Sequence, residues 1–207
     1  MTNLFFGCKL LTELPDLSNW DISEVTDLTS VFDSCENLKK LPDINNWNTE
    51  RVISMSRLFN NCYSLKELPN ISVWKTSSVK DMSYMFFSCQ DLQEINDIDI
   101  WDTSNVEDMK KMFCSCKRLK ILPDISKWNI DKVKNMEYMF MECFDLKFKF
   151  QIHEWEKLNN VNIKKSMFAD IISVNKEQIE IIESNRAGIY RKEVNQNGKQ
   201  DSDCIII

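Results

Sequence analysis

The stretch MFCSCKRLK, residues 112–120, places two cysteines two positions apart, Cys114 and Cys116, with basic residues behind them. A C-x-C pair of this kind can form half of a metal site or a redox pair, because thiolates bind metals and exchange disulfides. The chain has one histidine, His153, which argues against most metal sites and catalytic triads that depend on histidine.

The remaining cysteines follow a regular spacing. Six cysteines and all six tryptophans recur at a constant step of 27 residues. They are Cys8, Cys35, Cys62, Cys89, Cys116 and Cys143, and Trp20, Trp47, Trp74, Trp101, Trp128 and Trp155. Columns of phenylalanine, leucine, isoleucine and valine share the step, and five units align without gaps over residues 14–148. A fixed period of this size is typical of a solenoid or repeat array.

The repeat favours a structural role for the cysteines. Equivalent side chains of neighbouring units are expected roughly 5 Å apart, the spacing of adjacent strands. A column does not bring four ligands to one point, which argues against a metal, and parallel Cβ directions disfavour disulfides without excluding them. We therefore predict a ladder of buried free thiols. Cys114, which interrupts the repeat at a polar position, is predicted to be a surface thiol without a role.

Each unit is predicted to contain a short strand, a turn that carries the tryptophan, and a short helix. In VKDMSYMFFSC, residues 79–89, apolar residues recur at steps of three or four, which indicates one face of a helix. LQEINDI, residues 92–98, is predicted to be extended. One unit buries too little apolar surface to offset the entropy of ordering it, so the units must stack. The predicted fold class is α/β, a leucine-rich-repeat-like solenoid of about five and a half such rungs.

The predicted solenoid spans residues 1–172. Within it, residues 1–13 are a partial unit, 14–148 are five full units and 149–172 are a degenerate unit. Residues 173–188 are predicted to form a capping helix, and residues 189–207 a flexible polar tail. The partial unit indicates either a truncated member of a longer family, which we favour, or a chain that pairs with something at that end.

The tail closes on Cys204-Ile205-Ile206-Ile207, which has the form of a C-a-a-X prenylation motif. The motif predicts a lipid on Cys204, and the alternative is a chance ending in an isoleucine-rich chain. A single lipid binds membranes weakly, so the expected association with a membrane surface is reversible.

Composition excludes several other classes of function. A formal net charge of −6 disfavours nucleic acid as a partner, and only 3 glycines leave no glycine-rich phosphate loop. No apolar run is long enough for a transmembrane helix. The aspartates at 16, 43, 97 and 124 are interpreted as turn residues rather than catalytic acids. We predict no catalytic residues, no cofactor and no metal.

The repeat pattern L-P-D-I-S-x-W-[ND]-T-S-x-V-x-x-M-x-x-M-F-x-x-C-x-x-L resembles that of the BspA-like leucine-rich-repeat surface proteins. The likeness covers about residues 1–155. It implies a curved leucine-rich-repeat-type solenoid and a role in cell-surface adhesion or protein binding. Some protist members are similar in ending on a C-a-a-X box, whereas this sequence lacks the signal or lipobox of the bacterial members.

The predicted function is a non-enzymatic interaction or scaffold protein with an unidentified protein partner. Its candidate partner-binding face consists of charged and polar residues that differ between units: Lys39, Lys40, Lys66, Glu67, Gln93, Glu94 and Lys120. The tryptophan column is predicted to be core, with a sugar-stacking strip as the alternative. Prenylation is cytosolic and 8 unpaired cysteines suit a reducing compartment, which favours the cytoplasmic face of a membrane. The alternatives are an adhesin-like protein at the cell surface and a truncated family member with no distinct function.

Overall fold

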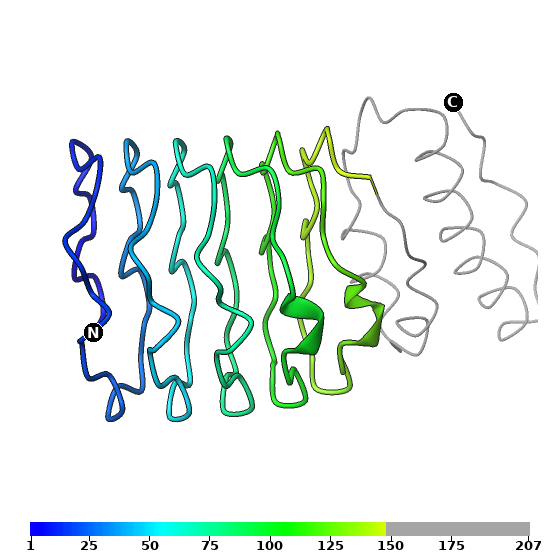
Figure 1. Ribbon diagram of the computed structural model, residues 1–207. Coiled ribbons are helices and arrows are strands. Elements are labelled where there is room, and N and C mark those ends of the chain that lie inside the picture. The colour runs from blue at the N-terminus through cyan, green and yellow to red at the C-terminus, as the bar shows by residue number, and fades with distance from the viewer. Residues whose placement is uncertain (148–207) are drawn as a thin grey trace, which may run out of the picture.

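The chain forms a stack of similar rungs that follow one another in chain order (Figure 1). The computed structural model describes residues 1–147. Ring centroids of Phe32 and Phe59 lie 5.7 Å apart with planes tilted by 5°, and Phe59 and Phe86 follow at 5.5 Å. This spacing confirms the predicted register of one rung per 27 residues and makes the described part of the chain a solenoid. The predicted degenerate unit, capping helix and tail, with Trp155, His153 and Cys204, lie outside the described residues.

The predicted short helix is absent from every unit that the structure describes. Residues 1–147 contain only two short 3-10 helices, η1 (Ile98–Ile100) and η2 (Ile125–Lys127). The extended parts make isolated parallel bridges between rungs rather than strands. These bridges join Asp27 to Ser54, Ser54 to Asp81, Asp81 to Asp108, Asp108 to Asn135, and Glu94 to Ile121.

Consecutive tight turns occupy the segment predicted to be helical. The N–H groups of Met85, Phe87, Cys89 and Leu92 each donate to the carbonyl three residues earlier. The N–H groups of Met82, Tyr84, Phe86 and Ser88 instead donate to carbonyls of the next rung. A helix directs its hydrogen bonds along its own axis and packs 8–10 Å from a neighbour, which is too far for rungs 5.7 Å apart. Steps of three or four therefore mark successive turn corners here.

Two columns of left-handed residues build these turns. A positive φ at the third residue is the mark of a type II turn. The first column is Asn3, Ser30, Arg57, Tyr84, Lys111 and Tyr138, and the second is Gly7, Ser34, Asn61, Ser88, Ser115 and Glu142. The regular recurrence of φ near +57° shows that the repeat extends to the backbone conformation as well as to the core side chains.

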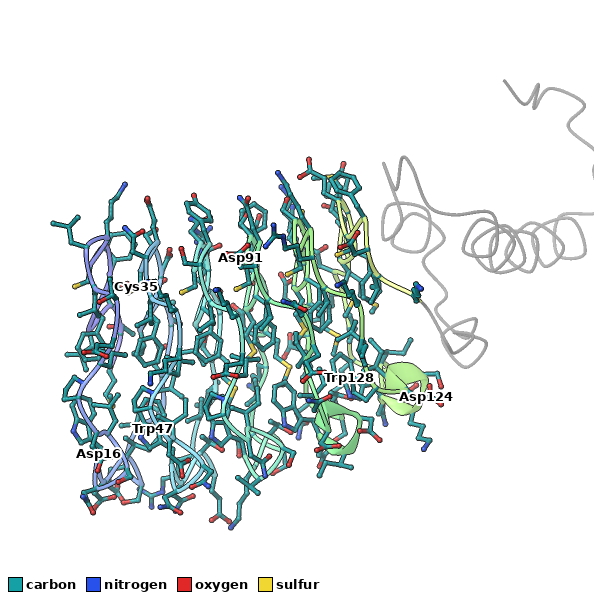
Figure 2. All side chains as sticks on the ribbon, turned by 45° about the horizontal axis from the view of Figure 1, so that its top comes forward. Asp16, Cys35, Trp47, Asp91, Asp124 and Trp128 are labelled. Carbon is teal, nitrogen blue, oxygen red and sulfur yellow. The ribbon has the colours of Figure 1, made fainter. Side chains whose placement is uncertain are left out.

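The predicted apolar columns form one continuous core along the stack (Figure 2). Phe32, Phe59, Phe86, Phe113 and Phe140 are fully buried, as are the methionines Met55, Met82, Met85, Met109, Met112, Met136 and Met139. Trp47, Trp74, Trp101 and Trp128 are 3–4% exposed. The prediction that the tryptophan column is core is confirmed from Trp47 to Trp128, whereas Trp20 in the first unit is 37% exposed.

Candidate functional site

The cysteine column is a ladder of buried thiols that bind rungs together. Each thiol donates a hydrogen bond to the carbonyl of a phenylalanine in the preceding rung. The pairs are Cys35 with Phe5 at 3.2 Å, Cys62 with Phe32 at 3.1 Å, Cys89 with Phe59 at 3.1 Å, Cys116 with Phe86 at 3.0 Å, and Cys143 with Phe113 at 2.9 Å. The predicted ladder of buried thiols is confirmed from Cys35 to Cys143, whereas Cys8 in the first rung is exposed. The bonding of the thiols to a carbonyl column went unpredicted because sequence spacing carries no signal for it.

Burial keeps these thiols protonated. It raises the pKa of Cys35 to about 12, and it raises the pKa values of Cys62, Cys89 and Cys143 well above the ordinary range. All the cysteines among residues 1–147 are free. Because the thiolate is the nucleophile and the metal ligand, these side chains are poorly suited to either chemistry.

The prediction for Cys114 was wrong, because this side chain is fully buried. The 27-residue register aligns it with Asp33, Asn60, Phe87 and Met141, a column that is polar at one end and apolar at the other. Its sulfur lies 3.6 Å from the hydroxyl oxygen of Ser115, and burial raises its pKa. The C-x-C pair that suggested chemistry is therefore two buried thiols whose columns are separated by that of Ser115.

The tryptophan column repeats this bonding scheme. The indole nitrogens of Trp74, Trp101 and Trp128 donate to the carbonyls of Ile44, Ile71 and Ile98 at 3.1, 3.1 and 2.9 Å. Trp47 donates to Leu17 in the same way at 3.3 Å. Indoles that are buried and bonded inside the stack do not present their faces to a sugar.

The aspartate column forms turns. Asp16, Asp43 and Asp124 each accept the N–H of the residue two positions later, at 2.8, 3.0 and 3.1 Å. This is the local bond expected of an aspartate in a turn. Asp97 instead precedes η1 in a left-handed conformation without a capping bond. Asp16 and Asp124 lie along one edge of the stack (Figure 2).

All seven residues of the candidate partner-binding face are exposed. An open groove of about 480 Å³ is lined by Thr12, Glu13, Lys39, Lys40, Lys66 and Glu67. A second groove, of about 300 Å³, runs from Glu67 to Ile71 and from Glu94 to Asp97. The structure thus brings Lys39, Lys40, Lys66, Glu67 and Glu94 together, whereas Gln93 and Lys120 line neither groove.

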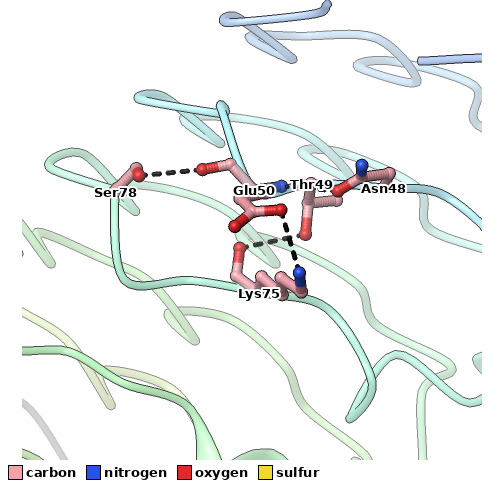
Figure 3. Close-up of polar contacts among 5 residues, drawn as sticks. All are labelled: Asn48, Thr49, Glu50, Lys75 and Ser78. Carbon is pink, nitrogen blue, oxygen red and sulfur yellow. Dashed lines mark hydrogen bonds and ion pairs between the residues drawn. The ribbon is translucent and has the colours of Figure 1, made fainter. Parts of the chain in front are cut away.

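Charged side chains elsewhere on the surface pair from rung to rung. Residues 1–147 contain six ion pairs, which are Lys9 with Glu36, Arg51 with Glu24, Lys75 with Glu50, Lys110 with Glu137, Arg118 with Asp91, and Lys134 with Glu107. Around Glu50, the ammonium of Lys75 approaches to 2.9 Å, and the hydroxyls of Thr49 and Ser78 add two further bonds between rungs (Figure 3). The hydrogen bond from Lys75 lowers the pKa of Glu50.

The lysines of the candidate face differ from the ion-paired lysines and arginines described above. Within residues 1–147, Lys39, Lys40, Lys66 and Lys120 make no ion pair. In the same part of the chain, no three histidine, cysteine or acidic side chains are arranged to hold a metal. No helix there has the length and apolar character needed to cross a membrane.

Comparison with known proteins gives one family match and matches to solved structures. No curated protein matches the chain. A leucine-rich repeat protein from Bacteroides ovatus is 21% identical, with a TM-score of 0.38 over 72% of this chain and 40% of that chain. The T. pallidum leucine-rich repeat protein is 18% identical, with a TM-score of 0.40 over 84% of this chain and 78% of that one. A leucine-rich cell surface protein from Faecalibacterium prausnitzii is 20% identical, with a TM-score of 0.37 over 60% and 36%.

The chain thus spans less than half the length of the Bacteroides and Faecalibacterium proteins. The family described as "Mycoplasma protein of unknown function, DUF285" matches residues 1–98 and residues 66–182. These two matches cover most of the chain and include the repeat units in which the tryptophan, phenylalanine and cysteine columns were found. The protein therefore belongs to the DUF285 family, with the BspA-like leucine-rich repeat that its motif indicates.

Proposed function

We propose that the protein is a non-enzymatic interaction module that binds a partner protein through the face formed by Lys39, Lys40, Lys66, Glu67, Gln93, Glu94 and Lys120. The observation that carries the proposal is the contrast between columns. Inner columns such as those of phenylalanine and cysteine keep one residue type from rung to rung and are buried from the second rung on, whereas this face is exposed and mixes lysine, glutamine and glutamate. Repeat arrays present such extended variable surfaces to their partners.

The cysteine thiols, which are the side chains with the greatest intrinsic reactivity, support the same proposal. The thiols are buried and bonded to carbonyls, which leaves them as packing groups. A regular solenoid holds its outer positions on a rigid frame, which lowers the entropy lost when a partner binds. The function that this architecture favours is recognition rather than catalysis.

Site-specific photocrosslinking tests the interaction face. A photoreactive amino acid at Lys66 is expected to capture a discrete partner in the cells that express the protein. The matched control places the same amino acid at Lys80, an exposed lysine outside both grooves. Capture at Lys66 but not at Lys80 supports the proposal, and equal capture at both positions, or none, contradicts it.

We also propose that a prenyl group on Cys204 attaches the module reversibly to a membrane. The support is the sequence Cys-Ile-Ile-Ile, which presents the thiol that a prenyltransferase modifies. Fractionation of cells that express the wild type or Cys204→Ser tests this. Loss of the protein from the membrane fraction in the variant supports the lipid, and unchanged recovery contradicts it.

A module exposed outside the cell is the second candidate, favoured by the BspA-like repeat itself, whose likeness implies surface adhesion. Protease treatment of intact cells separates the two locations. Digestion of the protein in intact cells favours the surface, and protection until lysis favours the cytoplasmic side. A family member with no distinct function predicts no specific capture at Lys66 in either location.

A further inference from the structure

The two grooves of the candidate face form one strip with opposite charge at its two ends. They share Glu67 and follow each other along the stack. Lys39, Lys40 and Lys66 line the first groove, in which Glu13 and Glu67 are the acidic residues. Glu67, Glu94 and Asp97 line the second, which contains no cationic side chain. The strip is therefore basic toward the first rungs and acidic toward the rung of Asp97.

At the basic end of the strip, the charges of adjacent rungs are arranged differently from those on the rest of the described surface. Pairs such as Lys110 with Glu137 and Lys134 with Glu107 set opposite charges in adjacent rungs, 27 residues apart. The same register sets Lys40 between Glu13 and Glu67, but it sets Lys39 beside Lys66, whose backbone N–H donates to the Lys39 carbonyl at 3.2 Å. Like charges opposite each other are unfavourable. Stability therefore does not explain these lysines, and a partner that brings negative charge would.

We propose that this strip binds an extended segment of a partner protein that carries acidic residues at one end and basic residues about four positions away. The inference rests on the proposed function and specifies the chemistry of its partner. The acidic residues lie over Lys39 and Lys66, and the basic residues lie over Glu94 and Asp97.

The rung spacing sets the length of this segment. Lys39 belongs to the rung of Phe32, and Glu94 belongs to that of Phe86. The phenylalanine rings of these rungs are separated by successive steps of 5.7 and 5.5 Å, so the two rungs are about 11 Å apart along the stack. An extended chain advances about 3.3 Å per residue, so three or four residues span this distance.

Charge, rather than backbone pairing, provides the recognition. The N–H groups of Lys39, Lys66 and Ile95 already donate within the stack, so the segment adds no strand to it. Exposed ion pairs each contribute about 1 kcal/mol or less. The binding is expected to be modest, to weaken as salt screens the charges, and to tolerate either chain direction.

Fluorescence anisotropy with short labelled peptides tests the proposal on the full chain. The probe is Asp-Asp-Ser-Ser-Lys-Lys, and a control of the same composition, Asp-Lys-Ser-Ser-Asp-Lys, mixes the charges. Two further peptides carry only aspartate or only lysine at both ends. The separated peptide is expected to bind about three- to tenfold more tightly than each of the others, the value of one or two such pairs.

A charge reversal provides the stringent test. In the double variant Lys39→Glu/Lys66→Glu both ends of the strip are acidic, so the peptide with lysine at both ends is expected to bind best. The double variant Lys80→Glu/Lys127→Glu makes the same net change at exposed lysines outside the grooves and is expected to keep the wild-type ranking. Unchanged thermal unfolding of both variants verifies that they fold.

Equal binding of the separated and mixed peptides overturns the inference, and so does a reversal variant that keeps the wild-type ranking. Sedimentation velocity adds an independent check: a dimer abolished by Lys39→Glu/Lys66→Glu assigns the strip to a second copy of the chain and overturns the peptide proposal. Specific capture at Lys66 without peptide discrimination leaves the proposed function standing and removes only this inference.

Discussion

The thiol of Cys89 donates a hydrogen bond to the backbone carbonyl of Phe59, 3.1 Å away in the preceding rung. The same oxygen accepts the N–H of Cys62 at 3.3 Å. One carbonyl therefore closes a turn in its own rung and binds the next rung, using both of its lone pairs. The arrangement recurs with Cys62 on Phe32 and with Cys116 on Phe86, so each buried cysteine of the 27-residue column acts as a connector between rungs.

Replacing a connector weakens the stack. Cys89→Ala removes the hydrogen bond and leaves a small void in a fully buried position, and it is expected to lower the free energy of unfolding by about 1–3 kcal/mol. Chemical denaturation measures the change. The matched variant Cys8→Ala lies at an exposed cysteine, and a loss there equal to that of Cys89→Ala would contradict the connector role.

The seven described cysteines differ in reactivity according to burial. In a Cys204→Ser background, iodoacetamide at neutral pH is expected to label Cys8 in the folded protein and the other six only after unfolding. Burial holds their pKa values above the ordinary range, so thiolate is scarce and access is blocked. Mass spectrometry identifies the labelled sites. Rapid labelling of Cys114 or Cys116 in the folded protein would contradict this account and support a reactive C-x-C pair.

The left-handed turn corners have their own side-chain preference. Asn61 has a φ of +56°, a region that asparagine and glycine tolerate and β-branched residues do not. Asn61→Val is expected to destabilise the protein by about 1–2 kcal/mol, whereas Asn61→Gly is expected to be nearly neutral. Thermal unfolding compares them with Lys80→Val, an exposed site that is not among the positive-φ residues. Equal losses at positions 61 and 80 would remove the backbone explanation.

The carboxyl groups of Asp81 and Asp108 lie in adjacent rungs joined by a parallel bridge. Burial, assisted by the charge of Asp81, raises the pKa of Asp108. A carboxyl whose folded pKa is raised costs stability above that pKa, and the cost disappears below its ordinary value of 3.8, where both states are protonated. Asp108→Asn is therefore expected to stabilise the protein at neutral pH and to have no such effect at pH values below 3.8.

Asparagine fits this column, because the amide oxygen of Asn135 accepts the N–H of Glu137 as Asp108 accepts that of Lys110. The converse change, Asn135→Asp, places another carboxyl beside Asp108 and is expected to destabilise at neutral pH. Denaturation of both variants at neutral and acidic pH measures these differences. A stabilisation by Asp108→Asn that persists in acid would show that charge is not its cause.

The identity of the buried side chains is largely predictable from the sequence, whereas the backbone conformation that carries them is not. Columns of Phe, Trp and Cys at a fixed step predict stacking, because only stacking buries them. The step of three or four between Val79, Met82 and Met85 does not distinguish a helix from consecutive turns. The deciding quantity is the spacing between rungs, which is too small for helices side by side.

The candidate binding face could be described only from the sequence and the structure together. The variable charges of Lys39, Lys66 and Glu94 predict an exposed face, but their grouping into grooves depends on how successive rungs lie side by side. The burial of Cys114 was missed because the residue was aligned with Ser34, Asn61, Ser88 and Glu142, a polar column that the 27-residue step assigns to Ser115. Its own column mixes Asp33 and Asn60 with Phe87 and Met141, so no periodic signal marks the position as interior.

Removal of one rung tests the stacking register most directly. Deleting residues 68–94, which is 27 residues, joins Glu67 to Ile95 and brings every later column back into register. Deleting residues 68–91, which is 24 residues, shifts every column. The account predicts that the first variant unfolds cooperatively with buried tryptophan emission at a lower Tm, and that the second does not fold. Equal folding of the two variants, or collapse of both, would contradict a body built from interchangeable rungs in a 27-residue register.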